Sequence, residues 1–361
     1  MKKLKILIFV LAAFLIADRL TGQDPSFSQF FSSPLNINPA LTGDINGKWR
    51  VISNYRSQWI GPGNPYSTGT ISFDSKIFQN VASNYVDENT RIGIGAMIMD
   101  DKAMAGVLKS NYASFNVSGN IMLKGKTGYE LNGARIRHNS KIKMDQTAEQ
   151  RLGVGLSLSY GHKQLDISKM TFGEQFVGYG FDTNLPSGEI AFSKMKAYAS
   201  TNAGIIYNYI KDKLSFDLGA SAYHLNKPKQ TFFNDDNQYL PTRYVLHGNL
   251  ETYLTRQLIL NTNAVYQYQS GASYFSVGGA LGYYLPNEEK DVIINGGLWY
   301  WSNNAVIPYV GFAYGNFQIG ITYDITISKL NDAPKRPQTF ELSLVVRQKG
   351  KSTGVIPSPW K

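Results

Sequence analysis

The chain has 361 residues and a formal net charge of +10, yet only 17% of its residues are charged and it contains no cysteine. The lack of cysteine excludes disulfides, thiolate metal sites and a lipoprotein anchor. The basic residues are scattered and form no basic helix or aromatic-basic patch, so we expect no nucleic-acid binding. An aromatic content of 13%, with 34 glycines and few charges, is typical of strands that face lipid.

Residues 1–22 have the pattern of a cleavable secretory signal. Lys2, Lys3 and Lys5 precede an apolar run at 6–17, which is shorter than the ~20 apolar residues of a transmembrane helix. We expect cleavage before Gln23 and export of the remaining chain. No later segment has ~18 uninterrupted apolar residues, so we expect no membrane helix after the signal.

The next segment, 23–47, is too rich in proline, serine and asparagine to form a strand or a long helix. It also carries apolar side chains, which would expose apolar surface if the segment were left unpacked. These are Phe27, Phe30, Phe31, Leu35 and Ile37. We therefore predict that the segment folds inside or across the periplasmic mouth of a barrel as a plug or lid.

Residues 48–347 show the alternation of apolar with small or polar residues that indicates β-strands. In 152–160, for example, Leu152, Val154 and Leu156 alternate with Gly153 and Gly155. We expect one apolar face and one small or polar face throughout, with the apolar side toward lipid. On this reading a lysine at Ser157 or Thr322, on the polar face, would be far better tolerated than one at Leu156 or Ile321, on the apolar face.

The pattern predicts an all-β fold, an outer-membrane antiparallel β-barrel of about 14 strands. Strands of ~10 residues fit a tilted membrane crossing, and backbone groups in lipid must all be paired, which requires closure. An even strand number is usual for bacterial barrels. The expected ranges are 48–60, 65–77, 90–100, 108–123, 151–163, 196–210, 213–224, 242–255, 257–268, 272–284, 291–301, 305–314, 316–327 and 338–347.

The connections divide into long and short ones, which predicts an orientation. We expect 164–195, 225–241 and 328–337 outside the cell, and tight periplasmic turns at 211–212, 256 and 315. Residues 348–361 would be a periplasmic tail. The segments 78–89 and 124–150 break the pattern, because they would be long periplasmic connections. Aromatic residues in the outer loops could bind a partner or pack on the loops themselves; these are Phe172, Phe176, Tyr179, Phe232 and Phe233.

Few residues indicate chemistry. None of the four histidines has a metal-binding spacing, and His224, which falls on the apolar face, is the one to test as a phospholipase-type base. An interfacial or loop histidine is the favoured reading. The pairs Asp100–Asp101 and Asp235–Asp236 are read as solvated turns rather than metal ligands. We expect no catalytic residue, no cofactor and no metal.

Four acidic residues, Asp217, Glu251, Asp324 and Glu341, fall on the polar faces of their strands. They could pair with Arg56 or with lysines and cross-link a filled lumen. A water-lined pore would carry them equally well, so the charges alone leave both possibilities open.

The segment after the signal carries a specific motif: Asp24, Pro25, Phe27, Ser28, Gln29, Pro34, Asn38, Pro39, Ala40 and Gly43. It closely resembles the mature N-terminus of the PorP/SprF family, outer-membrane components of the type IX secretion system of the Bacteroidetes. A first-hairpin motif extends the resemblance, with Tyr55, Arg56, Gln58 and Trp59. The last two strands also resemble the family. The length of 124–150 and Ser358, at the place of a cysteine in the family tail, depart from it.

The resemblance implies a non-enzymatic protein of the Gram-negative outer membrane. Family members support the export or surface attachment of type IX cargo, and some serve one large adhesin in gliding or adhesion. The implied partners are type IX components, cargo and outer-membrane lipid. Arg56, Gln58 and Trp59 at the first hairpin could hold the N-terminal segment or a partner; the alternative is that Trp59 is a girdle aromatic and Arg56 a lumen charge. The alternative function is a passive porin or apolar-solute transporter with 23–47 as a hatch.

Overall fold

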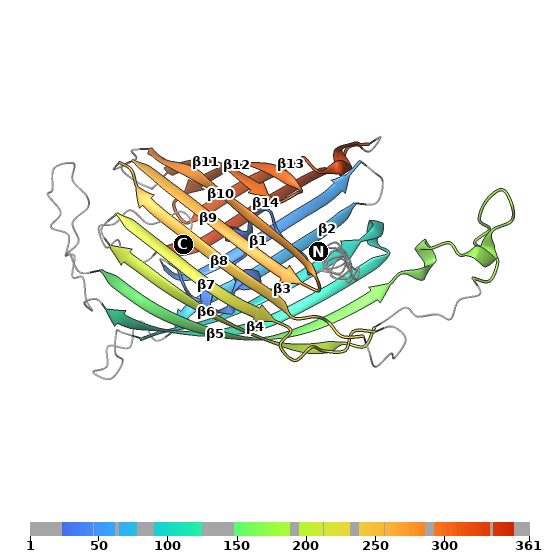
Figure 1. Ribbon diagram of the computed structural model, residues 1–361, viewed down its shortest axis with the longest axis horizontal. Helices are drawn as coiled ribbons and strands as arrows, with labels where there is room; N and C mark the ends of the chain where they lie inside the picture. The colour runs from blue at the N-terminus through green and yellow to red at the C-terminus, as the bar shows by residue number, and fades with distance from the viewer. Residues whose placement is uncertain are drawn as a thin grey trace, which may run out of the picture.

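Fourteen antiparallel strands close into one barrel in the computed structural model (Figure 1). Each strand pairs with its neighbours in sequence, and β1 closes the barrel against β14. The predicted fold class is therefore confirmed. The structure describes residues 24–45, 47–61, 65–77, 90–124, 148–187, 195–211, 213–231, 238–255, 257–285, 292–332 and 335–349.

Every strand overlaps its predicted range, and no strand end differs by more than three residues. The strands are β1 (Gly47–Ile60), β2 (Tyr66–Ile77), β3 (Thr90–Ala103), β4 (Leu108–Lys124), β5 (Glu149–Leu165), β6 (Tyr198–Lys211), β7 (Leu214–Tyr223), β8 (Arg243–Tyr253), β9 (Leu258–Gln269), β10 (Ala272–Leu285), β11 (Val292–Trp301), β12 (Ala305–Tyr314), β13 (Phe317–Thr326) and β14 (Gln338–Lys349).

The helices of the described residues are short, and none is long and apolar enough to cross a membrane. Three lie in the N-terminal segment: η1 (Phe30–Ser32), α2 (Pro34–Ile37) and η2 (Pro39–Leu41). The others lie in connections and are η3 (Met104–Gly106), η4 (Ile167–Lys169), η5 (Gly173–Gln175) and η6 (Lys329–Asp332). The signal region 1–22, the whole of 78–89, most of 124–150, and the tail after residue 349 lie outside the described residues.

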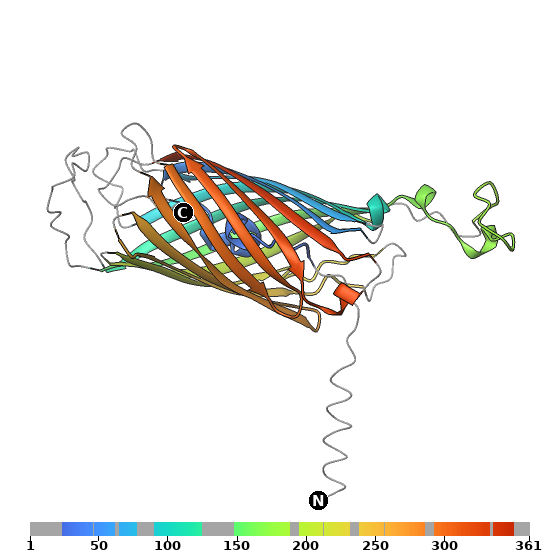
Figure 2. The same cartoon turned by 90° about the horizontal axis from the view of Figure 1, so that it is seen from above.

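The two ends of the barrel differ. The connection from 166 to 197 starts at the end of β5, and its described part projects as an arm beyond the strands (Figures 1 and 2). We therefore call this end of the barrel the arm mouth. The other end, where β1 begins and β14 ends, is the β1 mouth. Antiparallel pairing places the connections 224–242 and 327–337 at the arm mouth as well.

The outer surface follows the predicted alternation on β5. Leu156 is 68% exposed on the outside, whereas Ser157 is 6% exposed on the lumen side. The same alternation on the other strands surrounds the barrel with outward apolar side chains, the surface that lipid requires.

A lysine at Leu156 should cost ~2–4 kcal/mol of folding free energy, because the site is near the middle of a lipid-facing strand. Leu123, which is also outward-facing but next to the end of β4, is the matched control, and a lysine there should cost ~0–1 kcal/mol. The folded fraction of each variant can be measured by heat modifiability on gels after refolding into lipid. Equal losses for the two variants would contradict the lipid-facing assignment.

The inner surface departs from the prediction in one sector. β11 and β12 turn large apolar side chains into the lumen, among them Trp299, Trp301, Ile307 and Tyr309, all at most 8% exposed. The inner face is therefore not small and polar throughout. Elsewhere it is polar but also buried, as at Thr322, which is 1% exposed. Ser157 and Thr322 are both buried, so we now expect a lysine at either position to be costly as well.

Candidate functional site

The lumen is filled by residues 24–45, which we call the inner segment; Figure 2 shows it in blue within the ring of strands. Its first described residue, Asp24, contacts Gln269 and Arg243 at the arm mouth. Its last part reaches the β1 mouth, where the Gly43 amide donates to Asp74 at 2.7 Å. The segment thus runs through the barrel from one mouth to the other, rather than lying only at the mouth where β1 begins.

The barrel wall binds the inner segment largely through its main chain. Wall side chains on β1, β4, β7 and β8 donate hydrogen bonds to carbonyl oxygens along the segment. The pairs are Arg56 to Ser26, Asn54 to Ser32, Tyr223 to Leu35, Arg243 to Asn36, Ser221 to Ile37, Arg50 to Leu41 and Ser118 to Thr42. Buried carbonyl groups need such partners, so the wall is built to hold irregular backbone in this place.

The motif residues explain the irregular backbone. Pro34 and Pro39 occupy the first turns of α2 and η2. A backbone N–H at such a position has no partner within the helix, so the missing N–H of proline costs nothing there. The Asn38 side chain accepts from the Ala40 amide at 2.8 Å and donates to the Ile205 carbonyl at 2.9 Å. Gly43 has a φ of 68°, a conformation that glycine adopts at little cost.

A buried charge cluster holds the start of the segment. Arg56, which is 1% exposed, lies 2.9 Å from Asp324 and 3.8 Å from Glu341, measured between nitrogen and carboxylate oxygen. The amides of Ser28 and Gln29 donate to the two Glu341 oxygens at 2.7 and 2.9 Å. The sequence left two possibilities for the acidic residues, a filled lumen or a water-lined pore. Asp324 and Glu341 fit the first, because they cross-link the wall to the inner segment in a filled lumen.

The opposite side of the segment packs in the apolar sector. Phe31 lies against Trp299 and Tyr309, with ring centroids 4.9 and 5.6 Å away. Phe30 and Ile37 join the same cluster. The inner segment thus has a polar side and an apolar side, and each meets the matching sector of the wall.

Glycines mark the closest approach of the wall to the segment. A Cβ at Gly155 would overlap the backbone of Pro39 and Ala40. One at Gly93 would overlap the Thr42 carbonyl, and one at Gly204 the Asn38 side chain. Strand glycines often mark such an approach of another backbone.

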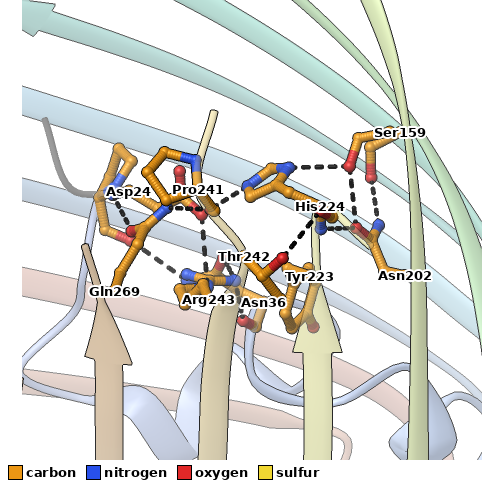
Figure 3. A network of polar contacts seen from close by, with 12 residues as sticks. Asp24, Asn36, Ser159, Asn202, Tyr223, His224, Pro241, Thr242, Arg243 and Gln269 are labelled. Atoms are coloured by element: carbon orange, nitrogen blue, oxygen red, sulfur yellow. Dashed lines mark hydrogen bonds and ion pairs between the residues drawn. The ribbon is translucent and has the colours of Figure 1, made fainter. Parts of the chain in front are cut away.

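Figure 3 shows the polar network that fixes the end of the segment at the arm mouth. An Asp24 carboxylate oxygen lies 2.8 Å from His224 Nε2 and 3.3 Å from Arg243 Nε. The Asp24 amide donates to Gln269 at 2.9 Å. On its other side, His224 Nδ1 lies 2.7 Å from the Ser200 hydroxyl.

The prediction that His224 lies on the apolar face is wrong. His224 follows β7 with a φ of 59°, and this turn directs the ring into the barrel. The order Ser200–His224–Asp24 matches that of a catalytic triad. However, Ser200 is 0% exposed and its hydroxyl also donates to Asn202. A substrate cannot reach a nucleophile in that position, so we read the network as an anchor for the segment.

The charges around Asp24 alter its ionisation. Burial alone would raise the pKa of the Asp24 carboxyl, but the charges of His224 and Arg243 and the hydrogen bond from His224 together outweigh it. They hold the pKa well below its usual value of 3.8. A carboxyl whose folded pKa is lowered stabilises the folded state above its unfolded pKa.

The anchor at Asp24 should therefore weaken in acid. Its contribution is fully present above about pH 3.8 and is lost progressively below that pH, because the unfolded state takes up the proton there while the folded state stays ionised. The rate of pepsin cleavage within residues 24–31 should rise over this range in the wild type. An Asp24→Asn variant should be cleaved faster than the wild type already above pH 3.8, and its cleavage rate should depend less on pH. Identical pH profiles would show that another group controls the release.

The first-hairpin residues divide between the two faces of β1. Arg56 faces the lumen, and the Gln58 amide lies beside its guanidinium. Tyr55 is 47% exposed on the outside. Trp59 is 42% exposed and meets Tyr66 edge to face, with ring centroids 4.9 Å apart. Arg56 therefore contacts the inner segment, whereas Tyr55 and Trp59 belong to the outer aromatic surface.

The loop aromatics are only partly described. Phe176 and Tyr179 are exposed on the arm, at 54% and 94%, and Phe172 is partly buried at its base. Phe232 and Phe233 lie outside the described residues, as do Asp235 and Asp236. Among the described residues, no group of three or more histidine or acidic side chains has the geometry of a metal site.

Several contacts were not predictable as sites from the sequence. Asp74 pairs with Arg50 at 2.8 Å and also binds the inner segment, and His247 lies 3.0 Å from the Asn38 amide. Nothing local distinguishes these residues from other lumen-facing polar residues. The glycines at 93, 95, 153 and 155 did give a signal for small lumen-facing positions. They alternate along their strands with the apolar residues, which lie on the opposite face.

A closed barrel of lipid-facing strands, filled by its own N-terminal segment, defines an outer-membrane β-barrel protein. The chain belongs to the PorP/SprF family, described as type IX secretion system membrane proteins, whose sequence profile matches residues 20–346. It is thus a membrane component of that system, and the predicted family is confirmed. The comparison with curated proteins gives no match.

Solved barrels show only weak similarity. The CymD monoaromatic hydrocarbon channel has 9% identity and a TM-score of 0.46, covering 89% of this chain and 94% of its own. A Pseudomonas aeruginosa FadL homologue has 10% identity and a TM-score of 0.44, covering 86% and 92%. The P. putida toluene transporter TodX has 9% identity and a TM-score of 0.43, covering 87% of this chain and 93% of its own. These values do not bear on function.

Proposed function

We propose that this protein acts in type IX secretion as a non-enzymatic binding and assembly module of the outer membrane. In this role it supports the export or surface attachment of cargo proteins, such as a large adhesin in gliding or adhesion. Residues 1–22 serve as the cleaved signal, the arm mouth faces outward, and 348–361 is a periplasmic tail. The inner segment is a plug.

The observation that carries the proposal is the filled lumen. The inner segment is bound by wall side chains from both sectors and reaches both mouths. A cargo polypeptide has no room beside it, so a role through the outer surfaces is favoured over passage through the barrel. A passive porin or apolar-solute transporter would require the plug to leave. Planar-bilayer recordings separate the two functions, because the plugged module should conduct little.

The arm supplies a surface for a protein partner. Its tip is a small hairpin in which Phe176 pairs with Phe181, their rings 5.3 Å apart. The buried Gln175 side chain donates to the Leu185 carbonyl at 2.9 Å and ties the hairpin together. Tyr179 extends from the tip. Large exposed aromatics on a preorganised loop suit interface anchors, since such side chains dominate binding energy.

The test uses the deletion strain and a tagged copy of the protein. Loss of the gene should reduce the secreted or surface-displayed type IX proteins, and the tagged protein should co-purify a type IX component or cargo. Replacing Phe176 and Tyr179 by alanine should weaken that capture, whereas Lys169→Ala, an exposed change on the same arm, should leave it intact. A normal secreted set in the deletion strain would refute the proposal.

A further inference from the structure

The wall pocket around Asp24 is made by residues that are far from it in sequence. His224 follows β7, Arg243 begins β8 and Gln269 ends β9, and each contacts Asp24 from the wall (Figure 3). The inner segment contributes the carboxylate, and the barrel contributes an imidazole, a guanidinium and an amide. Removal of the Asp24 side chain would therefore leave these wall groups in place around a vacancy.

Arg243 has binding capacity that Asp24 does not use. The guanidinium is 3% exposed, lies 4.2 Å from the Tyr223 ring and donates from Nη2 to the Asn36 carbonyl at 2.9 Å. Within the described residues its Nε and Nη1 make no hydrogen bond, although Nε is 3.3 Å from the Asp24 carboxylate. Arginine commonly binds a carboxylate with two parallel hydrogen bonds, and buried donors without partners are costly.

The remaining charges near the pocket also favour an anion. Lys163 on β5 interacts electrostatically with Asp24 and, to a smaller extent, with Asp101 on β3. A cavity of about 10 Å³ adjoins the pocket and is lined by Asp24, Ser26, Arg243, Gln267, Gln269, Ala272 and Tyr274. That volume holds about one water, so a ligand carboxylate fits only where the Asp24 carboxylate now lies.

We propose that His224 and Arg243 form a carboxylate-binding site for an acidic peptide that enters at the arm mouth, and that Asp24 occupies this site as an internal ligand. The inference goes beyond the proposed function and does not depend on which cargo is bound. An arriving acidic side chain takes the place of Asp24 and frees the end of the inner segment. Because Asp24 is tethered, its effective concentration is high, so a free small carboxylate does not displace it from the wild-type site, and an acidic peptide does so only when it is also held at the arm mouth.

The experiment is chemical rescue of the full-length Asp24→Gly protein in detergent. Acetate is titrated against sodium chloride at constant ionic strength, with acetamide as the neutral control. Acetate should raise the thermal midpoint of this variant by roughly 2–4 °C in a saturable way. Acetamide should have no effect. The wild type, whose site is occupied, and Asp24→Gly/Arg243→Met, whose site is broken, should not respond to acetate.

A second arm tests the peptide. Acetyl-Gly-Asp-Gly-amide should bind Asp24→Gly about tenfold more tightly than the matching asparagine peptide, a difference of ~1.4 kcal/mol. If Asp24→Gly does not fold in chloride, its refolding yield as a function of acetate replaces the midpoint. The proposal is wrong if the aspartate and asparagine peptides bind Asp24→Gly equally, if acetate stabilises the variant no more than the wild type, if the double variant responds equally, or if the yield is independent of acetate.

Discussion

Replacing Arg56 by methionine is expected to destabilise the folded protein by about 3–5 kcal/mol, the usual cost of leaving a buried charge without its partner. Methionine keeps much of the side-chain volume, so the loss comes from the charge. Asp324 and Glu341, at 3% and 0% exposure, would face each other without the guanidinium between them. The contact of Arg56 with the Trp301 ring, 4.8 Å from its centroid, would also change. Urea unfolding of the refolded barrel measures the difference.

A triple variant, Arg56→Met with Asp324→Asn and Glu341→Gln, is the matched control. It removes all three charges, and a buried ion cluster replaced as a whole costs much less than one that has lost a single member. The amide that replaces the Glu341 carboxylate keeps one acceptor oxygen, so one of the Ser28 and Gln29 backbone amides loses its acceptor. We still expect the triple variant to recover much of the stability, because no buried charge is left without a partner. If Arg56→Met unfolds at the wild-type urea concentration, the cluster does not hold the segment.

The barrel was predictable because its signal is local and repeated. On β5 each outward residue faces lipid and each inward residue meets the lumen, so the period of two is visible over the whole strand. The short connections between β6 and β7 and between β12 and β13 fall where the apolar alternation stops. Strand ends could therefore be predicted to within three residues without knowledge of the partners.

The inner face was less predictable, because it depends on what fills the lumen. Trp299 on β11 and Ile307 and Tyr309 on β12 look like lipid-facing residues on strands that are apolar on both faces. They belong instead to the buried cluster against which Phe31 packs. A continuous apolar run is the sequence signal for a strand buried on both sides. Our assumption of one polar face prevented that reading of β11 and β12.

The anchor of the inner segment was out of reach for a different reason. Ser28 and Glu341 are 313 positions apart, and Asp24 and His224 are 200 apart. No pattern within a strand relates such residues, because their contact is created by closure of the barrel. The motif from Asp24 to Gly43 indicated that the segment is specific, but not which wall residues receive it.

Gly155 is the wall position at which added volume should have the largest effect on the inner segment. A valine there would overlap the Pro39 and Ala40 backbone, which cannot rotate away as a side chain can. Overpacking a filled site costs about 1–3 kcal/mol or more, and ~1.4 kcal/mol is a tenfold change in an equilibrium. We expect proteolysis of residues 24–45 to accelerate about tenfold or more, and conductance to appear in planar bilayers.

Gly119→Val is the matched control, because Gly119 faces outward on β4 and an added Cβ meets nothing within 4 Å. Both changes add the same β-branched side chain, which strands favour, so they differ only in what the side chain meets. In the Gly119→Val variant the inner segment should stay protected from proteolysis, and no conductance should appear in planar bilayers. If Gly155→Val does the same, the wall and the segment are not in the tight contact described here, and the closed lumen loses its main support. If both variants open the barrel, the added volume acts through the strands rather than through the segment.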